Sequence, residues 1–356
     1  MLTIYPDTKI YIHTPAGSVT GGPELLHQLA DLLNNNSREA FIVYYGTKDH
    51  IAPKDYQLYN IKVSNYIEDN NHNIEIYPEV QGEEILQNTR STQKFLWWLS
   101  VDNFFHDGWD LHNIKLRDIF KFNFNLGLFH LKDRIKCSIY YKRNFFKGKR
   151  TLALISKYDS GYQAEYIRNF LSKVGFKNIY PLSDFINDQY FEENSSCTKK
   201  DIILYNPKKG FEFTKKLIEA TPDLSWIPLE NLNRMELIRL IQSAKIYIDF
   251  GNHPGKDRLP RECAISGCCI ITGKRGSATF FEDVPIKNKY KFNDNDKSIQ
   301  NIIATIRWVL NNYEQAILDF CDYRNKINLE KEEFTKQVFQ LFQIKHEKST
   351  QHSYTD

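Results

Sequence analysis

Short apolar runs alternate with amphipathic stretches along the first half of the chain, a pattern that predicts strands followed by helices. Lys9–Pro15, Ala40–Gly46 and Lys94–Val101 have the length and composition of strands, and IKVSNYI and NIEIYPEV are two further strand candidates. An apolar stripe at helical spacing lies between the first two runs and consists of Leu25, Leu26, Leu29, Leu32 and Leu33. That helix should begin near Gly22 and Pro23, because proline suits a first helical turn.

The second half of the chain shows the same alternation. Strands are predicted over Asp201–Pro207, Leu224–Leu229, Ile246–Phe250 and Cys268–Thr272. A strongly amphipathic helix is predicted over Ser298–Tyr313, and one more helix follows it. Strands that alternate with helices indicate βαβ units and parallel sheets.

The polar stretch Leu182–Lys200 separates the two blocks. Shortly before it, Thr151–Tyr158 is predicted as a strand, and the residues from Asp159 onward as a helix. We expect an N-terminal domain over residues 1–185 with an aromatic and basic insertion at about 104–150, a C-terminal domain with closing helices over 186–345, and a disordered tail at 346–356. The predicted fold class is α/β, with two Rossmann-like, doubly wound domains.

Composition narrows the classes of function. A chain of 356 residues is long enough for two cores. Its 47 basic and 44 acidic residues give no overall case for a nucleic-acid partner. None of the six cysteines forms a CxxC pair, which is typical of core thiols in a reducing compartment and predicts neither a metal site nor a cofactor. Without a signal peptide or a membrane-spanning apolar run, we expect a cytoplasmic protein.

The segment GNHPGKDRLPRE, residues 251–262, is the most informative in the chain. It connects a buried strand to a short helix and carries Lys256 and Arg258. Ligands bind open α/β sheets where strands end at their carboxyl side, and helix N-termini favour anions. The segment therefore predicts a site for an anionic ligand such as a nucleoside diphosphate.

The order of these motifs resembles the GT-B glycosyltransferases, in particular the large retaining group that includes glycogen synthases and bacterial polysaccharide glycosyltransferases. Three features carry the resemblance: Gly21-Gly22 before the first helix, Lys209-Gly210 after the first strand of the second block, and Glu262 in PRECAISGCC. The resemblance implies two domains that face a cleft. It also implies a nucleotide-sugar donor and a glycan, lipid-linked or protein acceptor in polysaccharide or glycoconjugate biosynthesis.

The resemblance also implies residue roles. Glu262 would bind the ribose hydroxyls, or else satisfy the dipole of its helix. Gly21 and Gly22 would form the acceptor and phosphate loop. The remaining donor-binding candidates are Lys209, His253, Lys256, Arg258, Gly276 and Ser277, and the cations among them could equally be solvated surface residues.

The sequence departs from the group's pattern at two points. Pro254 occupies the position of the first of two glutamates that have seven residues between them, the second being Glu262, and LYNPKKG lacks the usual arginine before Lys209. These departures leave a nucleotide-sugar epimerase or hydrolase, or a non-catalytic binding subunit, as alternatives. Retention of the anomeric configuration is favoured over inversion.

The base that deprotonates the acceptor should come from the first domain. Asp102 follows a predicted strand and His13 ends the first one, so both are candidates. Their alternatives are a helix cap and a core histidine.

The segment Lys132–Arg150 carries many cations interleaved with tyrosine and phenylalanine. It is a candidate for peripheral contact with an anionic membrane, and the alternative is a solvated insertion.

Overall fold

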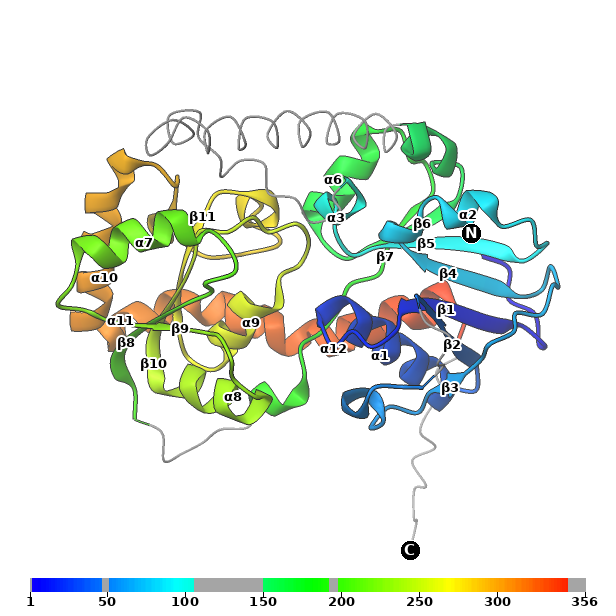
Figure 1. Ribbon diagram of the computed structural model, residues 1–356, viewed down its shortest axis with the longest axis horizontal. Coiled ribbons are helices and arrows are strands. Elements are labelled where there is room, and N and C mark those ends of the chain that lie inside the picture. Colours follow the sequence, from blue (N-terminus) through cyan, green and yellow to red (C-terminus); the bar gives the residue numbers. More distant parts are fainter. Residues whose placement is uncertain (1, 47–50, 106–149, 192–197, 345–356) are drawn as a thin grey trace, which may run out of the picture.

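The computed structural model describes residues 2–46, 51–105, 150–191 and 198–344. Two parallel sheets lie side by side, each flanked by helices (Figure 1). Most of the predicted insertion, all of Lys132–Arg150 except its last residue, and the tail at 346–356 fall outside the described residues. The predictions for those segments therefore stay predictions.

The first sheet has seven parallel strands in the order β3-β2-β1-β4-β5-β6-β7. Their bounds are β1 Lys9–Pro15, β2 Glu39–Tyr45, β3 Lys62–Val63, β4 Ile74–Pro78, β5 Gln93–Trp98, β6 Asp159–Tyr162 and β7 Ile179–Pro181. The chain builds outward from β1 to β3, then returns to place β4 on the other side of β1. The strand order therefore reverses between β1 and β4, where open sheets form a crevice.

Helices cover both faces of this sheet: α1 (Gly21–Asn35) on one, and α2 (Glu84–Gln87), α3 (Asp102–Phe105) and α6 (Glu165–Lys173) on the other. Short 3₁₀ segments are η1 (Lys54–Tyr56), η2 (Glu79–Gln81) and η4 (Asp188–Phe191). Neighbouring Trp97 and Trp98 belong to cores on opposite faces of β5. A strand covered on both faces explains its unbroken apolar run.

The prediction of a strand over Thr151–Tyr158 is wrong. Residues 150–155 are helical, and β6 begins only at Asp159. Leu152 and Ile155, three positions apart, share one core beside Trp98, as residues on one helical face do. The strand that pairs with β5 is β6 instead. The two strands pack closely, because a Cβ on Gly161 of β6 would lie 3.0 Å from the Phe95 ring of β5. The following helix, α6, accordingly begins at Glu165 rather than at Asp159.

The second sheet has five parallel strands in the order β12-β11-β10-β8-β9, so its strand order reverses between β8 and β10. Its strands are β8 Lys200–Tyr205, β9 Ser225–Pro228, β10 Ala244–Asp249, β11 Cys269–Gly273 and β12 Lys291–Phe292. Its helices are α7 Phe211–Ala220, α8 Arg234–Ser243, α9 Arg258–Ile265, α10 Ile299–Asn311 and α11 Tyr313–Ala316, with η5 Gly276–Thr279, η6 Asn288–Tyr290, η7 Asp296–Ser298 and η8 Ile317–Phe320 between them. The predicted strands and the amphipathic helix of this half are confirmed.

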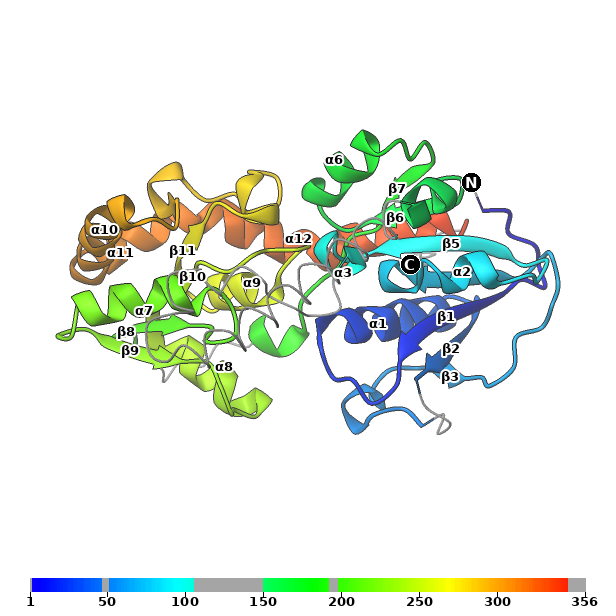
Figure 2. The same cartoon turned by 45° about the horizontal axis from the view of Figure 1, so that its top comes forward.

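The last helix, α12 (Cys321–Leu341), runs from the second sheet to the first (Figures 1 and 2). Tyr323 and Ile327 pack in the second core, whereas Phe334 and Val338 pack in the first. One rigid element therefore contributes to both cores and connects the two halves. No helix within the described ranges combines the length and the apolar character that a membrane span requires.

Candidate functional site

A cleft of about 630 Å³ lies where the carboxyl ends of both sheets face each other. Its first wall follows β1, β2, β4, β5 and β6 and includes the N-terminus of α1, and its second wall follows β8 and β10. Both points of strand-order reversal, β1/β4 and β8/β10, therefore open into it. The volume falls within the usual range for small-molecule sites.

The two walls touch at the floor of the cleft. Ser100 and Gly255 form an antiparallel bridge, and the Val101 N–H donates to the Pro254 carbonyl at 2.8 Å. A Cβ on Gly255 would lie 2.0 Å from the Leu99 carbonyl oxygen, so only glycine allows this approach. The contact fixes the loop after β10 against the end of β5.

Five of the predicted residues line the cleft together: Gly21, Gly22, Lys209, Lys256 and Arg258. The Lys209 ammonium lies 2.9 Å from Asp257. Burial alone would lower the pKa of Lys209, but the carboxylates of Asp257 and Asp249 outweigh it and raise that pKa. Lys209 is therefore a permanent cation on the second wall.

Arg258 reaches across the cleft to the first wall. Its Nη1 donates to Glu24 of α1 at 2.5 Å, and its Nη2 donates to Gln28 at 3.3 Å. Burial raises the pKa of Glu24, but the charges of Arg258 and Arg234 outweigh it and lower that pKa. Arg258 thus forms an ion pair between the two walls, directly over the Gly21 backbone.

Lys256 lies in a buried charge network. Its ammonium is 3.2 Å from Asp184 and 3.0 Å from Glu330 of α12, and Arg261 binds the same two carboxylates at 2.7 and 2.6 Å. Two cations and two carboxylates therefore balance one another where α9, α12 and the linker meet. Sequence reasoning missed Arg261, because its partners lie about 70 residues away in either direction.

His253, Gly276 and Ser277 do not line the cleft, and the first and last of them are buried. The Ser277 N–H donates to the His253 carbonyl at 2.9 Å. The His253 ring is fully buried, 3.6 Å from Asp249 and 3.5 Å from Asp257. Burial lowers the pKa of His253, but the two carboxylates outweigh it and raise that pKa.

Asp249, His253 and Asp257 place ligand atoms within 4.8 Å of one another, close enough to hold a metal ion. However, Lys209 already pairs with Asp257, and Asp249 accepts bonds from the Gly251 N–H and the Tyr247 hydroxyl. The group therefore fits a balanced ion cluster better than a metal ligand set. The sequence expectation of no metal stays a prediction.

Glu262 lies on α9, one turn after Arg258, and is 7% exposed. Burial raises its pKa, while Arg258 and Arg261 act in the opposite direction. The structure places it behind the cleft wall rather than on the lining. Its proposed contact with ribose hydroxyls stays a prediction.

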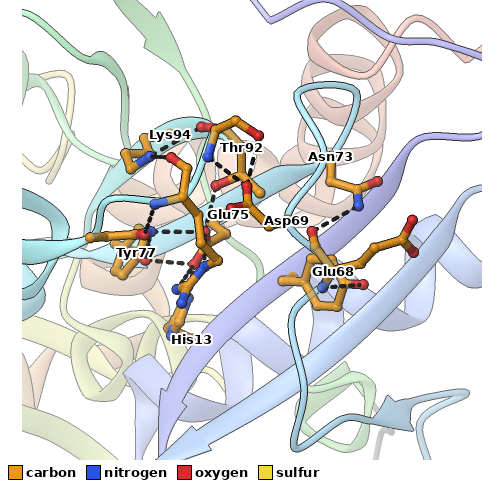
Figure 3. Close-up of polar contacts among 12 residues, drawn as sticks. His13, Glu68, Asp69, Asn73, Glu75, Tyr77, Thr92 and Lys94 are labelled. Atoms are coloured by element: carbon orange, nitrogen blue, oxygen red, sulfur yellow. Dashed lines mark hydrogen bonds and ion pairs between the residues drawn. The ribbon is translucent and has the colours of Figure 1, made fainter.

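The two candidate bases of the first domain are also off the lining. Asp102 begins α3 and accepts a 2.5 Å hydrogen bond from Asn252 of the second wall. His13 lies 3.0 Å from Glu75 and stacks on Tyr77 at 4.1 Å between ring centroids. Figure 3 shows this cluster, in which Glu75 also accepts bonds from Tyr77, Asn88, Arg90 and Thr92.

Sequence reasoning missed one carboxyl on the first wall. Glu79 follows β4 directly, lines the cleft and is 2% exposed. The rule that selected Asp102, a carboxylate at the carboxyl end of a strand, applies equally to Glu79 in YPEV.

Solved structures share this arrangement of two sheets around a cleft. A sucrose-phosphate synthase from Thermosynechococcus elongatus matches with a TM-score of 0.62 at 11% identity, over 94% of this chain and 98% of that one. HepE from Anabaena, in complex with UDP and glucose, matches with a TM-score of 0.58 at 10% identity, over 94% and 99%. A glycosyltransferase from Rickettsia africae matches with a TM-score of 0.51 at 13% identity, over 94% and 99%.

The chain has the GT-B fold. The fold class predicted from the sequence is thereby confirmed. No protein-family model matches the sequence, and no curated protein matches it either. At identities of 10–13%, the similarity establishes the GT-B architecture and leaves the function to the residues of the cleft.

Proposed function

We propose that this protein is a glycosyltransferase that transfers a sugar from a nucleoside diphosphate donor to a hydroxyl group of an acceptor. The observation that carries the proposal is the placement of Lys209 and Arg258 opposite the N-terminal backbone of α1 in one cleft between two Rossmann-like sheets. Cations and a helix N-terminus are the groups that stabilise a diphosphate leaving group.

The proposal assigns different tasks to the two walls. The diphosphate binds Lys209 and Arg258. Arg258 releases its hydrogen bond to Glu24 when it binds the diphosphate. Charge that develops on the leaving phosphate is neutralised by these cations rather than by a metal ion. Turnover should therefore persist in the presence of EDTA.

UDP is the first nucleotide to test, because structural neighbours have been solved with UDP and UDP-glucose. For the acceptor we propose a surface glycan, a lipid-linked saccharide or a protein, within polysaccharide or glycoconjugate biosynthesis. We further propose that the anomeric configuration is retained.

A binding panel followed by a turnover panel tests the proposal. UDP, GDP, ADP, TDP and CMP are added to the protein, and the shift in its unfolding temperature is recorded. A nucleotide at about 100 times its dissociation constant stabilises a fold by about 2.7 kcal/mol. Release of the nucleotide from the matching nucleotide sugars is then measured, with water and with simple sugars as acceptors.

The expected result is stabilisation by one nucleotide, lost in Arg258→Ala, together with release of that nucleotide from a sugar donor that is faster with a sugar acceptor than with water alone. Binding without any turnover would favour a non-catalytic GT-B subunit. Turnover that isomerises or only hydrolyses the donor would favour the epimerase or hydrolase alternative. If no nucleotide binds, the proposal is wrong.

A further inference from the structure

Glu79 is the first residue after β4 and lies at the strand-order reversal of the first sheet. Its neighbours along the cleft are Pro78 and Val80, with Leu99 after β5 and Tyr45 after β2. This position is on the wall opposite Lys209. The Glu79 residue lines the same cleft as Lys209 and Arg258.

One hydrogen bond fixes the orientation of the side chain. The backbone N–H of Leu99 donates to Oε2 of Glu79 at 3.0 Å. Within the described part of the chain, Glu79 has no ion pair. A buried carboxyl that is held in place by backbone and left without a cation is an unusual and costly arrangement unless a ligand uses it.

The other carboxylates along the cleft are differently placed. Asp184 is bound by Lys256 and Arg261, Asp257 by Lys209, and Asp249 by the groups described above. Each of these has a structural partner that would have to be displaced before it could accept a proton. Glu79 would not need to displace a partner of this kind before it accepts a proton.

Burial also changes the acidity of this group. It raises the pKa of Glu79 from the usual 4.5 to about 7, and the backbone hydrogen bonds offset only part of that rise. A base is most effective when its pKa lies near the working pH. Near neutrality, Glu79 would exchange a proton readily.

We propose that Glu79 is the general base that accepts the proton of the acceptor hydroxyl in the transfer step. This inference rests on the proposed function. The acceptor O–H bond breaks and its proton passes to the Glu79 carboxylate, while the acceptor oxygen forms a bond to the anomeric carbon on the same face from which the diphosphate leaves, so that the configuration is retained. The bond from that carbon to the diphosphate oxygen breaks, and its electron pair leaves with the nucleoside diphosphate.

The test compares Glu79→Gln with Glu84→Gln, a matched change of an exposed carboxyl five residues further on. Glutamine keeps an oxygen that can accept the Leu99 N–H but cannot take up a proton. With the nucleotide sugar that the wild type turns over, Glu79→Gln should lower kcat by about 100-fold or more. UDP affinity should stay within about twofold of the wild type, and Glu84→Gln should behave like the wild type.

Two further readouts separate proton transfer from a structural role. The acidic limb of the wild-type pH profile should lie near pH 7 and be absent in Glu79→Gln, and formate should restore part of the activity of Glu79→Ala. Independently of turnover, ¹³C-carboxyl NMR should show one glutamate that titrates near pH 7 in the wild type and is missing in Glu79→Gln.

Normal kcat in Glu79→Gln, or an ordinary acidic titration of Glu79 by NMR, would overturn this assignment and leave the proposed function in place. Failure of the wild type to bind any nucleotide of the panel would instead count against the proposed function itself.

Discussion

The two walls of the cleft hold their charges in opposite ways. On the wall formed after β8 and β10, Lys209, Lys256 and Arg258 each lie within ion-pair distance of a carboxylate. On the wall formed after β4, the Glu79 carboxyl has only backbone hydrogen bonds as stabilising partners. Glu79, Lys256 and Arg258 are all largely buried, so the difference between them lies in pairing rather than in exposure.

The charged groups of this cleft therefore serve two purposes. The buried network of Lys256, Arg261, Asp184 and Glu330 is internally satisfied and connects α9 to α12, which is a structural task. A carboxyl left unpaired costs stability and is typical of a reacting group. Stability should therefore depend mainly on the paired charges, and chemistry on the unpaired Glu79 carboxyl.

The largest expected change is a loss of stability when the buried charge network is broken. Arg261→Met leaves Asp184 and Glu330 with one cation between them, and breaking such a buried pair typically costs about 3–5 kcal/mol. Urea unfolding should show this loss. Lys331→Met removes an exposed ion-pair partner of Asp188 from α12, the helix that also carries Glu330, and should cost less than about 1 kcal/mol. Equal losses in the two variants would contradict the account.

Replacement of the unpaired Glu79 should instead increase stability, by an amount that depends on pH. The folded protein binds more protons at Glu79 than the unfolded chain does between pH 4.5 and about 7, so the stability that Glu79 confers is lost as pH rises through this window. At pH 8, Glu79→Gln should be more stable than the wild type by up to about 3 kcal/mol, since one pKa unit corresponds to about 1.4 kcal/mol. Urea unfolding at pH 4 and pH 8 measures the gap, which should close at the lower pH. A gap that is the same at both pH values would show that Glu79 titrates normally.

Lys209→Met should weaken UDP binding by about 10–100-fold, because a hydrogen bond to a charged group contributes about 1.5–3 kcal/mol. Isothermal titration calorimetry measures the affinity. Lys208→Met, a change of the exposed neighbouring cation, should leave it unchanged. Loss of affinity in both variants would indicate general electrostatic attraction instead of a specific contact.

The smallest expected change is in UDP affinity when the ion pair between Arg258 and Glu24 is removed. Glu24→Gln removes the carboxylate that competes with a diphosphate for Arg258, so UDP affinity should rise a few-fold, a change of less than about 1 kcal/mol. The same calorimetric titration applies, with Asp31→Asn on the same helix as the control. Weaker UDP binding in Glu24→Gln would mean that Glu24 orients Arg258 for the ligand.

Much of the fold could be predicted because hydrophobic periodicity is local. The strand runs and the leucine stripe of α1 identified their elements. The rule about carboxyl ends of strands selected Arg258, the resemblance to GT-B glycosyltransferases selected Gly21 and Lys209, and all three line one cleft. Local pattern failed at Thr151–Tyr158, where a short apolar run fits a helix as well as a strand. Only the packing of Leu152 and Ile155 on the sheet decides between them.

The remaining differences depend on contacts between residues far apart in the chain. Lys256 could not be recognised as part of a buried network, because Asp184 and Glu330 lie more than 70 residues away. His13 could have been judged better, because strand alternation places it on the face opposite to Ile10 and Ile12. Glu79 was within reach of the same rule that selected Asp102, but its burial and lack of a cation needed the structure.

A crystal structure of the protein with UDP bound would show whether the donor diphosphate binds between the two walls of the cleft. The account predicts that the diphosphate lies within hydrogen-bond distance of the Lys209 ammonium and the Arg258 guanidinium, that the bond from Arg258 to Glu24 is broken, and that Glu79 makes no contact with the phosphates. A diphosphate bound away from Lys209 and Arg258, or UDP located outside the cleft, would contradict it.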